Sequence, residues 1–169
     1  MSSVDPLARD FDHLHARQTF ASQGRTITEA DLVSFSALTG DRHPVHADDV
    51  WAKSSQFGAR IAHGMLLLSY AVGLEPFDPE YVVALRGVDE VTFRRPVHIG
   101  DTVHLEGEVE DLKEIDSLLG LVVFKWRLAN QRGELVVRAR VTALWRRQIE
   151  PQTPLPDPTG EADLREVYL

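Results

Sequence analysis

Residues 39–65 read TGDRHPVHADDVWAKSSQFGARIAHGM, and this stretch carries the most specific information in the chain. Asp41 and His46 lie five positions apart, with Pro44 between them to restrict the backbone and stiffen the loop. A carboxylate that is ionised at neutral pH and an imidazole that titrates near neutrality form a natural pair for general acid–base chemistry. His63 and Gly64 are expected to open a helix, whose first N–H groups favour a developing negative charge. Together these residues predict a reaction centre.

Each of these residues also has an ordinary structural interpretation. Asp41 follows Gly40 and could be only a turn residue, because Gly-Asp pairs are frequent in turns. His46 alone is more often a hydrogen-bonded loop histidine than a catalyst, and Gly64 alone carries almost no information. Only the combination and its spacing favour the catalytic interpretation.

The pattern Gly-Asp-x-x-Pro-x-His-x-Asp at residues 40–48, followed by Ile-Ala-His-Gly-Met-Leu at residues 61–66, resembles the MaoC-like dehydratase family. This family includes the (R)-specific enoyl-CoA hydratases and adopts the hot dog fold. The similarity extends from about Arg25 to Arg147, which is most of the chain. Two motifs at the right separation are more specific than a single Asp–His pair.

The resemblance implies a role for six residues. Asp41 and His46 match the catalytic pair, and Gly64 matches the glycine whose backbone N–H holds the thioester carbonyl. The residues expected to support the motif are His43, Pro44 and His63. His43 departs from the family, because the motif usually has Asn at this position. A neutral histidine can donate one hydrogen bond and accept another, as an amide can, but its geometry differs and it can become charged.

Length and composition are those of a single ordinary globular domain. The chain has 169 residues, with 43% hydrophobic and 26% charged residues. A net charge of −8 argues against nucleic acid or an anionic membrane as a partner, so an anionic coenzyme A thioester would need a local basic patch. The chain has no cysteine, which excludes disulfides, a thiol nucleophile and a cysteine zinc site. No stretch has signal-peptide character or the length of a membrane span, so we expect a cytoplasmic protein.

The chain order predicts one domain with two extensions. Residues 1–17 are expected to form a polar N-terminal extension, residues 18–148 a single MaoC-like domain, and residues 149–169 a proline-rich tail. A first strand is expected over residues 18–26, with Phe20 pointing inward. Thr28 and Asp31 predict a capping box for a helix over residues 29–38, which Gly40 can end in the left-handed conformation. Asp48 is expected to cap a further short helix ending near Ser55.

The segment from Gly64 to Leu74, GMLLLSYAVGL, contains no charge and is expected to be a helix buried nearly all round, with residues 65–68 in the core. Strands with alternating burial are expected over residues 91–94, 103–110 and 135–145, and residues 119–128 suggest a central strand or a dimer contact because both faces are apolar. Gln131-Arg132-Gly133 predicts a hairpin turn. These patterns predict an α+β protein, and the resemblance makes it a hot dog fold with an antiparallel sheet around a central buried helix.

The expected activity is that of a hydro-lyase: reversible hydration of a trans-2-enoyl-CoA, or a related acyl thioester, to the (R)-3-hydroxyacyl thioester by water that Asp41 and His46 activate. The stereochemistry comes wholly from the resemblance. No metal or redox cofactor is expected, and coenzyme A enters as part of the substrate. Four basic residues are candidates for docking it: Lys53, Arg60, Arg94 and Arg95. A homodimer or a dimer of dimers is expected.

Two alternatives stay open. A thioesterase on the same fold would direct water at the thioester carbon and release free coenzyme A. A non-catalytic acyl-thioester-binding dimer module is the second alternative, and the departure at His43 is the feature that supports it.

Overall fold

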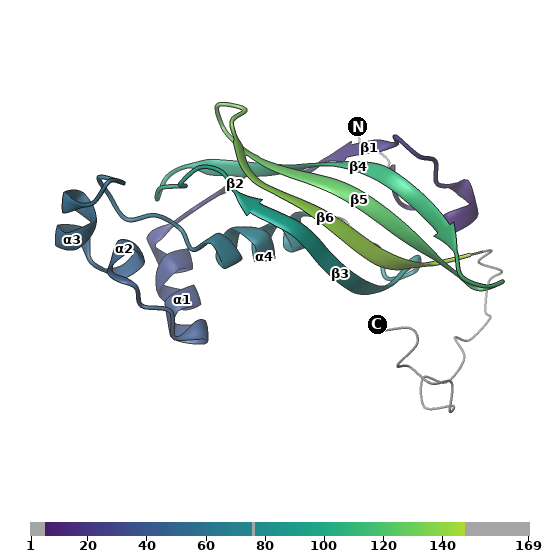
Figure 1. The fold of residues 1–169 in the computed structure, drawn as a ribbon, viewed down its shortest axis with the longest axis horizontal. Coiled ribbons are helices and arrows are strands. Elements are labelled where there is room, and N and C mark those ends of the chain that lie inside the picture. Colours follow the sequence, from purple (N-terminus) through teal and green to yellow (C-terminus); the bar gives the residue numbers. More distant parts are fainter. Residues whose placement is uncertain (1–5, 76, 148–169) are drawn as a thin grey trace.

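The computed structural model describes residues 6–75 and 77–147, and its centre is one antiparallel sheet (Figure 1). The strand order is β1-β4-β5-β6-β3, and β2 also pairs with β4. The strands are β1 (Thr19–Ala21), β2 (Arg25–Thr26), β3 (Val82–Phe93), β4 (Thr102–Glu114), β5 (Leu119–Asn130) and β6 (Leu135–Arg146). The last four strands are long, and β4, β5 and β6 follow one another through short connections, so most of the pairing is local in sequence.

The helices are η1 (Phe11–His13), α1 (Glu29–Thr39), α2 (Pro44–Ala47), α3 (Asp49–Ser54) and α4 (Gly64–Leu74). Figure 1 shows α4 lying along one face of the sheet, while α1, α2 and α3 gather beyond one end of it. None of the helices in the described part of the chain is long and apolar enough to cross a membrane. The predicted α+β class, with a sheet around one helix, is confirmed.

The central strand of the sheet is β5, which lies between β4 and β6. Val122, Val123 and Phe124 are all buried, so both faces of this strand are covered, as its sequence predicts for a central strand. On β4, Val103 and Leu105 are fully buried and alternate with half-buried residues, which confirms the predicted alternation. The predicted turn at residues 131–133 is also present, with Gly133 at φ 73°.

The first predicted strand is two strands. Phe20 is buried as expected, but the ladder is interrupted after Ala21. The Ser22 backbone N–H donates to the Leu105 carbonyl at 2.8 Å, and the Ser22 hydroxyl accepts from the Leu105 N–H at 2.8 Å. The side chain of Ser22 therefore takes a bond that a strand would make with its own carbonyl.

The helix α4 is less enclosed than its composition predicts. Leu66, Leu67, Leu68 and Ala71 are buried, but Met65 is 57% exposed. The prediction of core burial was therefore wrong for Met65. The reason is geometric, because the sheet of a single chain covers only one side of the helix (Figure 1). The amino-acid composition of the helix cannot show which of its sides the sheet covers.

The N-terminal segment is not purely polar. Leu7, Phe11 and Leu14 are buried, and the Trp145 indole N–H donates to the Arg9 carbonyl at 2.8 Å. The ring of Phe11 fills the space above Gly120, where a Cβ would lie 2.4 Å from ring atoms. Part of the expected extension therefore belongs to the core. The domain limits at residues 18 and 148 stay a prediction, and the proline-rich tail lies outside the described residues.

Candidate active site

The helix α1 delivers Asp41 to the site. Thr28 caps the helix: its side chain accepts from the Asp31 N–H, and the Asp31 carboxylate accepts from the Thr28 N–H at 2.7 Å. At the other end Gly40 adopts φ 79°, a left-handed conformation that glycine reaches without strain, and its N–H donates to the Ser36 carbonyl at 3.0 Å. Both predicted helix signals are confirmed. Asp41 is the next residue, so rigid structure precedes it directly.

Asp41 itself is exposed. Its N–H donates to the Thr39 hydroxyl at 3.3 Å, and its carboxylate accepts from the His43 N–H at 3.2 Å. One carboxylate oxygen is therefore oriented by the backbone of the same loop. Within the described residues, the other carboxylate oxygen accepts no hydrogen bond, so it is available to accept one from a ligand.

His43 caps the next helix. Its Nδ1 accepts a hydrogen bond from the Val45 N–H at 3.2 Å, which is the role of an N-cap side chain at α2. Its ring packs edge-on against Trp51, with 5.5 Å between ring centroids, and it is not among the residues that line the pocket. An asparagine side chain makes the same cap bond through its carbonyl oxygen. The departure from the family motif therefore preserves the hydrogen bond while changing the group that makes it.

His46 is held in one tautomer. Its Nδ1 lies 2.7 Å from the Ile61 carbonyl oxygen. A carbonyl only accepts, so Nδ1 must carry a proton, and in the neutral ring Nε2 is left with a free lone pair. This is the arrangement that a general base requires, with one ring nitrogen fixed and the other available.

His63 lies directly against His46. The two imidazoles are stacked with 3.8 Å between centroids and 25° between planes. The Nε2 atom of His63 is 3.2 Å from the Asp41 carbonyl oxygen and 3.2 Å from the Ser36 hydroxyl. Burial lowers the pKa of His63, and this outweighs the opposing effect of the Asp41 carbonyl, so the ring is uncharged at neutral pH.

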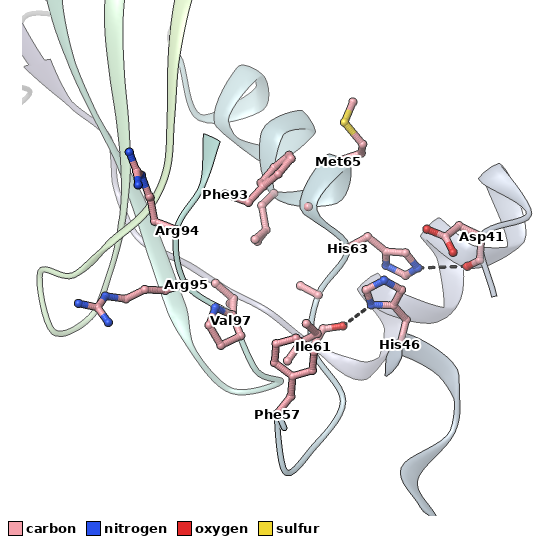
Figure 2. Close-up of a pocket in the computed structure, with 14 residues that line it drawn as sticks. Asp41, His46, Phe57, Ile61, His63, Met65, Phe93, Arg94, Arg95 and Val97 are labelled. Atoms are coloured by element: carbon pink, nitrogen blue, oxygen red, sulfur yellow. Dashed lines mark hydrogen bonds between the residues drawn. The ribbon is translucent and has the colours of Figure 1, made fainter. Parts of the chain in front are cut away.

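These residues meet at a pocket of about 460 Å³ (Figure 2). Figure 2 shows Asp41, His46 and His63 together on one side, with Arg94 and Arg95 on the opposite side. The full lining is Asp41, His46, Phe57, Ile61, Ala62, His63, Gly64, Met65, Leu67, Phe93, Arg94, Arg95, Pro96 and Val97. The carboxylate and imidazole groups therefore lie on one side of the pocket and two guanidinium groups on the other, and most of the remaining wall is apolar.

Gly64 forms part of this wall at the first residue of α4. The first N–H groups of a helix have no acceptor within it, so no group of α4 accepts from the Gly64 N–H. A Cβ at this position would lie 2.9 Å from the ring of Phe93, too close for an undisturbed side chain. A larger residue here would therefore displace the half-exposed ring of Phe93.

A metal ion does not suit the cluster well. Asp41, His46 and His63 offer ligand atoms within 4.8 Å of one another. However, the two imidazoles are stacked at 25° between planes, so their in-plane lone pairs run side by side and do not converge on one point. The absence of a metal in the reaction therefore stays our prediction, supported by this geometry.

The structure also corrects one docking candidate. Arg60 donates through Nη1 to Glu29 at 2.8 Å and through Nε to Asp49 at 2.7 Å, and its side chain is only 13% exposed. It therefore joins α1 to α3 and is not a free cation at the pocket. Arg94 and Arg95 do line the pocket, while Lys53 does not.

Three groups that contact the residues of the candidate active site could not be predicted from the sequence. The Ile61 carbonyl that orients His46 is a backbone atom, which any residue could supply. Ser36 reaches His63 from a helix, and Phe93 reaches Gly64 from the end of β3. Each contact joins segments distant in the chain, so local patterns could not predict it.

A sheet curved along a helix defines the hot dog class of proteins. A Mycobacterium tuberculosis protein described as having a double hotdog fold is similar over 86% of this chain and 46% of its own, with a TM-score of 0.75 and 21% identity. The expected fold is thereby confirmed. The model of the MaoC like domain matches residues 10–123, so the chain belongs to this family.

Relatives with descriptive names are similar across the same region. The (R)-specific enoyl-CoA hydratase of Aeromonas caviae is 33% identical over 108 residues, covering 64% of this chain and 78% of that protein. The R-hydratase structure from Pseudomonas aeruginosa has a TM-score of 0.67 at 29% identity, covering 87% of this chain and 95% of that one.

Other relatives are considerably longer than the matched region. Protein MaoC of Klebsiella aerogenes is 35% identical over 103 residues, which are 60% of this chain. The 3-hydroxybutyryl-CoA dehydratase of Methylorubrum extorquens is 37% identical over 91 residues, which are 52% of this chain. The chain spans 31% and 56% of the lengths of these two curated relatives.

Proposed function

We propose that the protein is a hydro-lyase that adds water reversibly to a trans-2-enoyl-CoA and forms the (R)-3-hydroxyacyl-CoA. The observation that carries the proposal is the bare Nε2 of His46 beside Asp41, at a pocket whose wall includes Gly64, the first residue of α4. The names of the hydratase and dehydratase relatives support the substrate class. The (R) configuration rests on those names alone.

In the proposed hydration, Asp41 and His46 hold one water molecule between them. The water oxygen attacks C3 of the enoyl group, one of its protons passes to the pair, and a proton is delivered to C2. The Nδ1–H bond to the Ile61 carbonyl keeps Nε2 of His46 available for this transfer. General acid–base catalysis of this kind contributes about 10²–10⁴-fold.

Gly64 supplies the complementary electrostatic group. As C3 is attacked, negative charge develops on the thioester oxygen, and a backbone N–H at the positive end of α4 stabilises it. One such donor is typically worth about 10²–10³-fold, so loss of either contribution should be clearly measurable. Because the donor is a backbone group, no side-chain truncation removes it, and a substitution at Gly64 is the most direct way to disturb it.

Arg94 and Arg95 are the proposed docking groups for the coenzyme A phosphates. Both line the pocket on the side opposite the Asp41–His46 pair, as Figure 2 shows. Since the chain carries a net charge of −8, local cations would have to supply the attraction. KM for the acyl-CoA should then rise with ionic strength while kcat changes less. A KM that does not change with ionic strength would refute this docking proposal, but it would not affect the proposed hydration step.

We further propose a homodimer or a dimer of dimers. Among the described residues, β3 pairs with β6 alone and forms an edge of the sheet, and Met65 and Phe93 are exposed near the pocket. A sheet edge and exposed apolar side chains are features that association covers. Light scattering on a size-exclusion column measures the mass directly, and a monomer at micromolar concentration would refute the proposal.

The test of the activity is incubation with crotonyl-CoA and a series of longer enoyl-CoA substrates. Loss of the enoyl absorbance is expected. Release of free thiol would instead identify a thioesterase, and no reaction across the series would leave a binding module. The control is Asp111→Asn, because Asp111 is an exposed carboxylate on β4 outside the pocket and should have no effect.

A further inference from the structure

His63 is a buried titratable residue that the hydration steps above do not use. It is only 1% exposed, although it lies beside a solvent-accessible pocket. It occupies the N-cap position of α4 but makes no side-chain bond to that helix. Burying an imidazole without capping the helix has a cost, because a polar group loses its hydration. The contacts of the ring must therefore serve something else.

The first contact holds the backbone of Asp41. Nε2 of His63 lies 3.2 Å from the Asp41 carbonyl oxygen, and a carbonyl can only accept. Nε2 must therefore carry the proton and donate it. The Ser36 hydroxyl, also 3.2 Å from Nε2, comes from α1 one turn before Asp41. The imidazole thus ties the start of α4 to the end of α1, where Asp41 begins its loop.

The second contact holds the ring of His46. The stacking distance of 3.8 Å between centroids puts the face of one imidazole against the face of the other. The Nδ1 bond from His46 to Ile61 leaves the ring free to rock about the direction of that bond. A flat partner on one face restricts this motion in a way that a single hydrogen bond cannot.

We propose that His63 is a positioning residue of this site, an uncharged imidazole that holds the Asp41 backbone by its Nε2–H and the His46 ring by its face. The inference rests on the proposed function, because that function makes Asp41 and His46 the reacting groups. The contacts of His63 with both residues do not depend on it. Asp41 lies just after the end of α1, whereas His46 lies within α2. A single side chain that touches both fixes their separation.

The uncharged state of the ring follows from its surroundings. Burial lowers the pKa of His63, and the neighbouring His46 acts in the same direction. The Asp41 carbonyl and carboxylate oppose this effect without reversing it. Nδ1 of His63 has no hydrogen-bond partner within residues 6–75 and 77–147, so the described contacts do not favour a second proton there.

Two substitutions separate the two contacts. His63→Gln keeps an N–H that can reach the Asp41 carbonyl but removes the ring, while His63→Phe keeps a ring that can stack on His46 but removes the N–H. Displacing a reacting group by about 1 Å can cost about 10²-fold in rate, so we expect each variant to lose about 10- to 100-fold in kcat. KM should change less than about threefold, because substrate-binding groups are untouched. His104→Gln on β4 is the matched control, since His104 is half-buried and bonded to Glu106 outside the pocket.

A purely structural role would lower the melting temperature and leave kcat per folded molecule unchanged. Wild-type kcat in a folded His63→Gln variant would refute a positioning role for the stacking contact. Wild-type kcat in a folded His63→Phe variant would refute a positioning role for the hydrogen bond to the Asp41 backbone. Nitrogen-15 NMR of the wild-type imidazoles provides a test without any variant. At about pH 7 it should show His63 protonated at Nε2 and bare at Nδ1. A doubly protonated ring or the Nδ1–H tautomer would overturn the proposal even if both variants fail to fold.

The same spectra separate this proposal from the proposed function. If the wild-type protein hydrates no enoyl-CoA, the proposed function fails, and the positioning role is then judged on His46 alone. Its ring signals should broaden or shift in His63→Gln and remain as in wild type in His104→Gln. Unchanged His46 signals in folded His63→Gln would refute the positioning role by itself.

Discussion

Replacing His43 by alanine should weaken the site, whereas replacing it by asparagine should not. His43 accepts a hydrogen bond from the Val45 N–H through Nδ1 and thereby caps α2. Alanine removes the acceptor. Asparagine restores it, because its side-chain oxygen can occupy nearly the same place and asparagine is among the best N-cap residues. Neither substitution removes a residue that lines the pocket.

The expected size follows from the element that is capped. Loss of an N-cap side chain costs about 1 kcal/mol, with a range of roughly 0.5–2 kcal/mol. The helix α2 has only four residues, Pro44–Ala47, so it has little internal hydrogen bonding to compensate. His46 is the third of them. We therefore expect His43→Ala to lose about 1 kcal/mol in the free energy of unfolding and about fivefold in kcat, because a misplacement that costs about 1 kcal/mol lowers a rate about fivefold.

The assay combines urea unfolding with hydration of crotonyl-CoA, both at about pH 8. His43→Asn should match the wild type within about 0.5 kcal/mol and about threefold in rate. If His43→Asn loses as much as His43→Ala, the imidazole itself acts, through its packing on Trp51 or otherwise, and the capping argument is wrong. If His43→Ala matches the wild type in both measurements, the cap does not support His46.

Three further outcomes follow from the structure. Asp41→Asn and His46→Gln should each remove most of the hydratase rate, and the double variant should be little worse than either, since members of one catalytic unit are not additive; losses that multiply would show that the two residues act separately. Gly64→Ala should lower kcat by about tenfold or more with little change in melting temperature, because the added methyl group would lie 2.9 Å from the half-exposed ring of Phe93, which can move; an unchanged kcat would remove Gly64 from the mechanism. Burial would raise the pKa of Asp31, but hydrogen bonds from Tyr70 and from the side chain and backbone of Thr28 outweigh it and hold the pKa at about 2. Asp31→Asn should therefore destabilise the fold by about 1 kcal/mol above pH 4, after allowance for solvent screening, and the difference should fade as the pH drops from about 4 towards about 2; a constant difference over that range in urea titrations would contradict the ionic origin.

The local features of the site were predictable because local chemistry produces them. The capping box at Thr28 and Asp31, the left-handed Gly40 and the helix start at Gly64 each depend on a few adjacent residues. The structure places all three where the sequence predicts them. The same holds for Asp48, whose carboxylate accepts from the first N–H groups of α3.

Two of the errors have a common origin in averages over composition. Residues 1–17 look polar on average, yet Leu7, Phe11 and Leu14 pack into the core. The segment 64–74 looks apolar on every side, yet Met65 is exposed beside the pocket. Burial depends on which elements arrive from elsewhere in the chain, and hydrophobic content does not specify that.

The sequence by itself determined most of the elements, the family resemblance and the short motif that carries Asp41 and His46, because hydrogen bonds, helix caps and strand alternation act over a few residues. Only the tertiary structure decided the tautomer of His46 and the contacts of His63, since these depend on the Ile61 carbonyl and on α1. It also decided that Arg60 forms ion pairs that join α1 to α3 and is not a lining residue of the pocket. The physical reason is range: the first group of interactions joins neighbours in the chain, whereas the second joins segments that meet only when the chain has folded.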